Sequence, residues 1–218
     1  MTIALFSDVH ANLPAFEAFL ADIDRRKPDA IYCLGDLVGY NIWPNEIIAA
    51  IRARGIATLA GNHDLKTNGY AYELILPDNS LYLNTLPRHI RLEYQLVDKP
   101  LNIVLAHGST RTINEYILED MDESYVLDLM NEAKADILCV GHSHLPYHRV
   151  MGDKQVINTG SVGKPKDSDP RGGYVLLTVE DDIKVEFIRF AYDIEKAANA
   201  ILQSPLPDEL ADRLRKAY

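Results

Sequence analysis

The chain alternates short apolar runs with amphipathic stretches through its first 144 residues. Residues 2–6 are apolar and predict a buried strand, and apolar positions at helical spacing predict a helix over 12–26. A break at 27–29 leads into a second apolar run over 31–34. A strand, a helix and a second strand in this order predict a parallel pair joined by a right-handed crossover.

The same pattern repeats as far as residue 140. Residues 69–86 are helical in pattern, but Pro77 interrupts them, because proline cannot continue a helix from within. The other expected elements are helices over 44–54 and 122–134 and strands over 56–60, 91–96, 101–106 and 136–140.

The pattern after residue 146 favours antiparallel hairpins. Strands over 147–151 and 155–157 flank one turn, and strands over 174–179 and 183–190 flank a second turn at 180–182. Two helices, over 194–203 and 207–217, follow. With no repeat or linker composition, we expect a single domain over residues 1–218, with two packed sheets and helices outside.

Composition and charge exclude some classes of protein and indicate the cellular compartment. The 218 residues are 47% hydrophobic and carry a net charge of −10, which argues against a dedicated nucleic-acid binder. Cys33 and Cys139 lie in apolar runs and are expected as buried thiols in a reducing compartment. The N-terminus lacks a signal-peptide pattern, and no apolar run approaches the ~20 residues of a membrane span, so we expect a cytoplasmic protein.

Five of the apolar runs end in aspartate, asparagine or histidine. Ligands bind at the carboxyl ends of strands in α/β sheets, so these side chains could meet at one rim. Imidazole and carboxylate groups suit Mn, Fe, Zn or Ni. The residues concerned are Asp8, His10, Asp36, Asn62, His107, His142 and His144, with His63 and Asp64 beside them.

Asp36 is the residue around which the others are expected to gather. Its carboxylate has two oxygens and can hold two metal ions, and Gly35 before it allows a sharp turn out of the strand. Each motif alone has a simpler explanation: a capped aspartate, a turn, or a histidine satisfied in the core. Their occurrence together, each closing an apolar run, favours a metal site.

These motifs resemble those of the calcineurin-like metallophosphoesterases. They are Asp8-x-His10, Gly35-Asp36, Gly61-Asn62-His63-Asp64, His107-Gly108 and Gly141-His142-x-His144. The loop at 158–163 and the segment at 191–197 are similar to the small bacterial and archaeal phosphodiesterase-like branch. The resemblance implies an α/β (α+β) fold: a four-layer α-β-β-α sandwich of two packed mixed sheets flanked by helices.

The resemblance also implies roles for individual residues. One metal ion would be held by Asp8, His10, Asp36 and His144, and the other by Asp36, Asn62, His107 and His142. His63 would be the general acid or stabilise the transition state, with Asp64 orienting its ring. The two metals, Mn, Fe, Ni, Co or Zn with Mn or Fe favoured, would present a bridging hydroxide for in-line attack on phosphorus.

The expected substrate is a small phosphodiester or a nucleotide-type phosphoester. No arginine follows Gly35-Asp36, and Asp64 stands where some subfamilies have glutamate, which disfavours phosphoproteins and dinucleoside polyphosphates. Phosphomonoesterase activity and a non-catalytic metal-binding scaffold stay open as alternatives. So does a homo-oligomer, whereas neither a nucleic-acid scaffold nor a membrane is expected as a partner. The residues whose contact with substrate stays undecided are Tyr40, Asn41, Lys164, Lys166 and Arg171.

Overall fold

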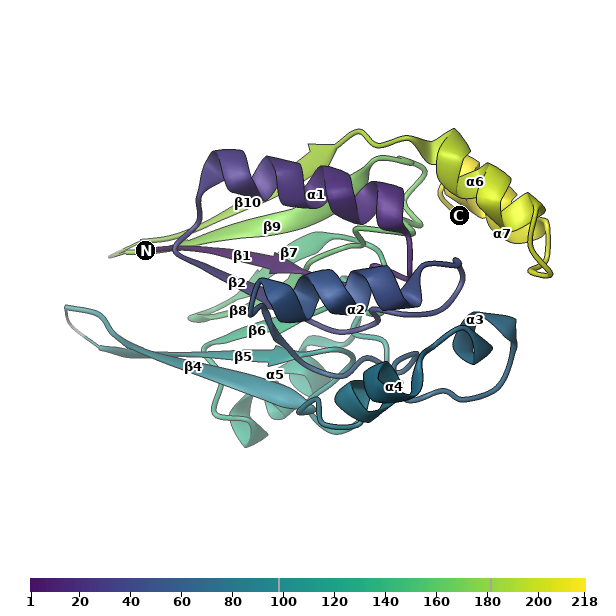
Figure 1. Ribbon diagram of the computed structural model, residues 1–218. Coiled ribbons are helices and arrows are strands. Elements are labelled where there is room, and N and C mark those ends of the chain that lie inside the picture. Colours follow the sequence, from purple (N-terminus) through teal and green to yellow (C-terminus); the bar gives the residue numbers. More distant parts are fainter. Residues whose placement is uncertain (98, 181) are drawn as a thin grey trace.

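Two five-stranded sheets lie face to face in the computed structural model, which describes residues 1–97, 99–180 and 182–218 (Figure 1). The first sheet has the order β10-β9-β1-β2-β3. β1 pairs in parallel with β2, as predicted, and antiparallel with β9. The strands are β1 (Thr2–Phe6), β2 (Ala30–Cys33), β3 (Ala57–Thr58), β9 (Gly172–Val179) and β10 (Ile183–Phe190).

The second sheet has the order β4-β5-β6-β8-β7. The predicted hairpin β7–β8 is antiparallel, but β8 also pairs in parallel with β6, so the sheet is mixed. Of the turn predicted at 180–182, residue 181 lies outside the described residues. The strands are β4 (His89–Gln95), β5 (Pro100–Ala106), β6 (Ile137–Val140), β7 (Tyr147–Met151) and β8 (Lys154–Asn158).

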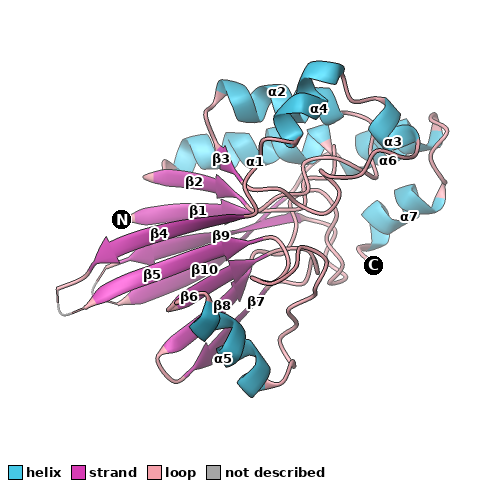
Figure 2. Cartoon of the chain, turned by 90° about the horizontal axis from the view of Figure 1, so that it is seen from below, coloured by secondary structure: helices cyan, strands magenta, loops and turns pink. Residues whose placement is uncertain are grey.

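Helices cover the outer face of each sheet (Figures 1 and 2). α1 (Leu13–Arg26) and α2 (Pro44–Ala53) lie on the first sheet, and α5 (Glu123–Glu132) lies on the second. Asn12 caps α1 by accepting from the Ala15 N–H. Pro77 separates the predicted helix into α3 (Tyr70–Glu73) and α4 (Pro77–Leu83), and it begins α4 because a first-turn position needs no N–H donor.

Three apolar layers hold the sandwich together. Phe16, Phe19 and Ile48 pack between the helices and the first sheet. Leu5 and Ile103 belong to the layer between the two sheets, and a third layer joins the second sheet to α5. These three apolar layers separate four layers of secondary structure in the order helices, sheet, sheet, helix. The predicted four-layer fold is thus confirmed.

Smaller predictions have mixed outcomes. Cys33 and Cys139 are free and buried, as expected. The strand predicted over 56–60 is only two residues long, because the N–H of Ala60 leaves the ladder and donates to the Pro87 carbonyl. In the part of the chain that the structure describes, no helix is both long and apolar enough to span a membrane.

The C-terminal helices form a separate pair beside the N-terminal end of α1 (Figure 1). α6 (Ile194–Leu202) and α7 (Glu209–Lys216) pack on each other through a small apolar cluster that includes Trp43. α6 also contacts α1. The pair lies at the end of the molecule toward which β1 and β2 run (Figure 1).

Candidate metal centre

The carboxyl ends of β1, β2, β3, β5 and β6 meet at one rim of the sandwich. The structure brings the predicted residues of these ends together in two buried triads whose ligand atoms lie within 4.8 Å of one another. The first triad is Asp8, His10 and His144, and the second is Asp36, His107 and His142. Asn62 joins the second triad, with its Oδ1 3.0 Å from Nε2 of His107.

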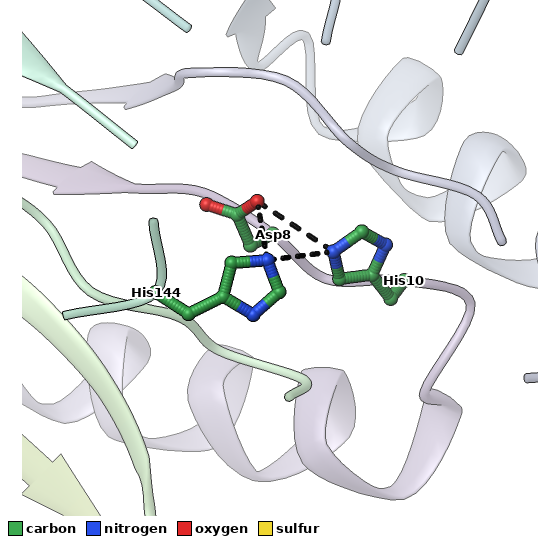
Figure 3. A group of neighbouring side chains, drawn as sticks. All are labelled: Asp8, His10 and His144. Atoms are coloured by element: carbon green, nitrogen blue, oxygen red, sulfur yellow. Dashed lines mark hydrogen bonds and ion pairs between the residues drawn. The ribbon is translucent and has the colours of Figure 1, made fainter. Parts of the chain in front are cut away.

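In the first triad, two imidazoles face one carboxylate oxygen (Figure 3). Nε2 of His10 lies 3.1 Å from Nε2 of His144, and these atoms lie 3.5 and 3.1 Å from Oδ1 of Asp8. Nδ1 of His10 donates to the Val38 carbonyl, and Nδ1 of His144 donates to the Lys164 carbonyl. Because the Nδ1 atoms carry the protons, both Nε2 lone pairs are directed at the centre of the triad.

The second triad has the same arrangement, except that in His142 the two ring nitrogens have exchanged roles: Nε2 is the donor and Nδ1 faces the centre. His107 donates from Nδ1 to the Leu34 carbonyl at 2.7 Å, which directs Nε2 toward Oδ2 of Asp36, 3.4 Å away. His142 donates instead from Nε2 to the Asn114 carbonyl, so Nδ1 is its free ligand atom. Oδ2 of Asp36 also lies 3.7 Å from Nε2 of His10, between the two triads.

Two buried carboxylate oxygens in these triads receive no hydrogen bond. They are Oδ1 of Asp8 and Oδ2 of Asp36, the same atoms that face the free imidazole nitrogens. A buried anionic oxygen without a donor is costly unless a cation compensates it. The donor set and its unsatisfied oxygens therefore fit a pair of metal ions, with Asp36 between them.

Burial and charge act differently on the histidines of the two triads. Burial lowers the pKa of His144 to about 4, which favours the neutral, ligating form of its ring. Burial also acts to lower the pKa of His107, but the adjacent Asp36 outweighs it and raises that pKa to about 10. A cation bound beside Asp36 would displace this proton.

The backbone at the rim is held in an unusual conformation. Asp8, His10, Asp36, His142 and His144 have φ between 50° and 66°, a left-handed region that costs free energy for residues with a Cβ. The close approach of neighbouring loops also requires glycine. A Cβ at position 35 would lie 2.3 Å from the Gly61 nitrogen, and one at position 61 would lie 2.1 Å from Oδ1 of Asp36.

Asp64 has a different role from the one expected. Its carboxylate does not contact the ring of His63, because both oxygens accept backbone N–H groups. Oδ1 accepts from Leu37 at 2.8 Å, and Oδ2 accepts from Asp36 and Gly61 at 2.8 and 2.9 Å. Asp64 thus fixes the loop that carries Asp36, and burial, followed by the charge of Asp36, raises its pKa to about 7.

Two other residues form hydrogen bonds with the His63 ring. The Tyr72 hydroxyl lies 2.5 Å from Nδ1, and the Lys66 ammonium lies 3.1 Å from Nε2. An ammonium group only donates, so Nε2 accepts from Lys66 and Nδ1 donates to Tyr72. The ring is neutral, because burial and the nearby His10 lower the pKa of His63 to about 3.

Sequence reasoning did not identify Ser7, Lys66 and Tyr72. Ser7 donates to Oδ2 of Asp8 at 2.5 Å, and its place just before the Asp8 motif is the one available signal. Lys66 follows His63 by three residues in a loop, where a lone lysine is unremarkable. Tyr72 lies in the short helix α3, whose position relative to the rim follows only from the fold.

The five residues left undecided by the sequence separate into two groups. Asn41 is buried and donates to the His10 carbonyl, and Arg171 is paired with Asp169 on the surface, so both have local partners. The Tyr40 ring packs against the rings of both His10 and His63, with centroids 4.7 Å from each, and these two imidazoles lie 5.0 Å apart. Lys164 places its Nζ 4.9 Å from the Tyr40 ring centroid, and Lys166 is half-buried nearby.

Comparison with known proteins agrees with this geometry. The model of the calcineurin-like phosphoesterase superfamily domain matches residues 1–182. A protein of Methanocaldococcus jannaschii described as uncharacterized is 33% identical over 245 residues, covering 97% of this chain and 96% of its own length.

Two solved structures extend the likeness to the whole chain. A metallophosphoesterase from Sphaerobacter thermophilus is 28% identical, with a TM-score of 0.82 and full coverage of both chains. A hypothetical protein from Pyrococcus horikoshii has the same fold, with a TM-score of 0.85 at 22% identity over 100% of this chain and 98% of its own. The chain therefore belongs to the calcineurin-like phosphoesterase superfamily and is a metal-dependent hydrolase of phosphoric esters.

Proposed function

We propose that this chain hydrolyses a small phosphodiester or a nucleotide-type phosphoester with two metal ions bridged by Asp36. The observation that carries the proposal is the position of Oδ2 of Asp36, which is buried, receives no hydrogen bond and lies between His10 and His107. Asp8, His10 and His144 would hold the first ion together with Asp36. Asn62, His107 and His142 would complete the second, with Mn or Fe favoured over Ni, Co and Zn.

The metal pair, when bound, would activate a water as nucleophile and neutralise charge on the phosphoryl oxygens. The protein groups around it would act on the leaving group. His63 would donate a proton to the leaving oxygen from its imidazolium form and return to the neutral ring, so it must first gain a proton on Nε2; the negative charge of the bound phosphoryl group would favour that proton. Displacement of Lys66 would open Nε2 for it, while Nδ1 keeps its hydrogen bond to the Tyr72 hydroxyl.

Lys66 would then be free to contact a phosphoryl oxygen of the substrate. Lys66 is an exposed residue whose ammonium contacts His63, so a bound anion could attract it away. Such a lysine would supply a positive charge that the chain lacks after Gly35-Asp36, where no arginine follows.

The substrate class is the finer part of the proposal. A phosphodiester is favoured over phosphoproteins and dinucleoside polyphosphates, for which that arginine would be expected. The alternatives are a phosphomonoesterase and a metal-binding scaffold without turnover. We place the reaction in the cytoplasm, because the free buried thiols fit a reducing compartment, and we treat residues 1–218 as one domain.

The test is metal-dependent turnover of matched esters. The protein is stripped with chelator, restored with Mn²⁺ and assayed on a chromogenic phosphodiester and its monoester. Diester hydrolysis that requires metal and falls by about 10²–10⁴-fold in His63→Ala is expected, because general acid catalysis contributes that much. Faster monoester turnover would make the chain a phosphatase. Two bound metals per chain without turnover of either ester would contradict the proposal.

A further inference from the structure

A cavity of about 290 Å³ lies beside the metal centre and takes no part in the roles described so far. Its walls come from α3 on one side and from the α6–α7 connection and the start of α7 on the other. Figure 1 shows α3 facing the C-terminal helix pair at the end of the molecule that carries the rim. The residues that define it are Tyr40, Tyr70, Tyr72, Leu206, Pro207 and Leu210.

Two residues of the cavity lining, Tyr72 and Tyr40, also contact His63. The Tyr72 hydroxyl contacts Nδ1 of His63 at 2.5 Å, and the Tyr40 ring centroid lies 4.7 Å from that of His63. Tyr40 also lies 4.7 Å from the ring of His10, at the first triad. A group in the cavity would therefore be attached on the side of the phosphorus where His63 would deliver its proton.

The cavity lining and the group next to it differ in chemistry. Tyr70, Leu206 and Leu210 give the cavity an aromatic and apolar surface, which suits a flat ring. Lys164 does not line the cavity but lies next to one of its walls: its Nζ is 4.9 Å from the Tyr40 ring centroid and has no hydrogen-bond partner among the described residues, although the residue is only 1% exposed. A buried, unpaired ammonium calls for an anion, so a phosphoryl group is expected near Lys164, beside the cavity.

We propose that the cavity binds the aromatic ring of the leaving group, so that the substrate is an aryl, benzyl or nucleoside phosphodiester rather than a dialkyl one. The inference rests on the proposed function, since it assigns the leaving-group side of the same site. The phosphoryl group would lie at the metal centre near Lys164, and the ring would stack between Tyr70 and the Leu206–Leu210 side. The leaving alcohol would take the proton of His63 as the P–O bond breaks, and water would supply the oxygen added to phosphorus.

The kinetic test compares two diesters whose leaving alcohols are similarly basic, benzyl methyl phosphate and ethyl methyl phosphate. Wild-type Mn²⁺-loaded protein is expected to favour release of benzyl alcohol, through a lower KM. The Tyr70→Ala and Leu210→Ala double variant should raise the KM for the benzyl ester about tenfold, with kcat nearly unchanged and the ethyl ester unaffected. Leu118→Ala, at an exposed leucine lining a different cavity, is the matched control.

A binding measurement separates this inference from the proposed function. Trp43 is the single tryptophan of the chain and packs against the same apolar cluster as Leu206 and Leu210, two residues of the cavity lining, so we expect its fluorescence to respond to a ring bound there. Phenyl phosphonate is expected to change that fluorescence saturably, methyl phosphonate more weakly by about tenfold, and the double variant should remove the difference.

The outcomes are distinct. Ring-dependent binding that the double variant abolishes, without turnover of either diester, would refute the proposed hydrolysis and keep the cavity as a ring-binding site. Equal turnover of both diesters and equal binding of both phosphonates, unchanged in the double variant, would overturn the inference and leave the hydrolase proposal intact.

Discussion

The two triads use the same residue types but differ in how far they are enclosed. In the first, Asp8 and His10 are fully buried, and His144 is 2% exposed. In the second, His142 is 7% exposed, Asn62 is half-buried, and the ring of the exposed Tyr116 stacks on His142 at 4.1 Å. The first triad is the more closed of the two, whereas the second is more exposed to solvent through His142 and Asn62.

This difference suggests that the two triads differ in how tightly they would bind a metal ion. Enclosed ligands with fixed ring orientations are expected to hold an ion tightly, and a more open set is expected to exchange its ion and accept substrate oxygens. Asp36 is the residue that the two sides would share. Variants that act on one side, on the shared residue or on neither should therefore have effects of different size.

The largest effect is expected from Asp36→Asn, because it removes the charge common to both sides. Metal content should fall for both ions, and kcat should fall on the order of 10³-fold or more, since metal ions contribute several kcal/mol of transition-state stabilisation. Elemental analysis and diester turnover measure the two effects. Asp22→Asn, at a buried aspartate on α1, is the control and should keep both metals. Retention of two ions by Asp36→Asn would exclude a bridging role.

A comparison of His144→Ala with His142→Ala tests the difference between the sides directly. Each variant should lose one ion at low metal concentration. Excess Mn²⁺ should restore His142→Ala at a concentration at least about tenfold below that needed for His144→Ala, because the closed site has no solvent to replace the missing ligand. Metal titrations followed by activity give the two midpoints. Equal midpoints would show that enclosure does not set affinity here.

A smaller effect is expected from Tyr72→Phe, which leaves both triads intact. Loss of one hydrogen bond to Nδ1 of His63 is worth about 0.5–1.5 kcal/mol, so kcat should fall by up to about tenfold while metal content stays constant. Tyr94→Phe, at a partly buried tyrosine on β4, is the matched control. A fall in metal content in Tyr72→Phe would mean that the hydroxyl supports the rim rather than His63.

The smallest effect on activity is expected at Asp22, a buried carboxylate that has protein partners where the triads would have metals. Burial acts to raise its pKa, but the Tyr174 hydroxyl and the side chains of Arg25 and Arg26 outweigh it and lower the pKa to about 2. A pKa below the unfolded value stabilises the fold above about pH 4, and this contribution is lost as pH falls toward 2.

Asp22→Asn should therefore destabilise the fold by about 1–2 kcal/mol at pH 7 and leave turnover unchanged. This value is smaller than the pKa shift alone implies, because solvent screens the interaction with the exposed side chains of Arg25 and Arg26. Denaturant unfolding of wild type and variant at pH 7 and at pH 3 measures the difference. It should shrink at the lower pH, and a difference that grows there would contradict the assigned pKa.

Most residues of the two triads could be predicted from the sequence, because they belong to short motifs that directly follow apolar runs. The strand that leads to Asp8 and the apolar run before Asp36 each predict both a strand of the sheet and the position of a carboxylate. The role of Asp64 was not predictable, since its partners are backbone N–H groups of a loop that the fold brings close. Tyr72 was missed for a similar reason: only the packing of α3 brings its hydroxyl to His63.

Each triad takes its ligands from both sheets. Asp8 and His10 follow a strand of the first sheet, whereas His144 follows a strand of the second, and the same holds for Asp36 and His107. Bound metals would thus link the two sheets at one end of the sandwich. Because they bind only the folded chain, they would stabilise it by mass action. Metal supply would then govern the protein's abundance as well as its activity, because a metal-starved chain would open more often and be degraded sooner by proteases.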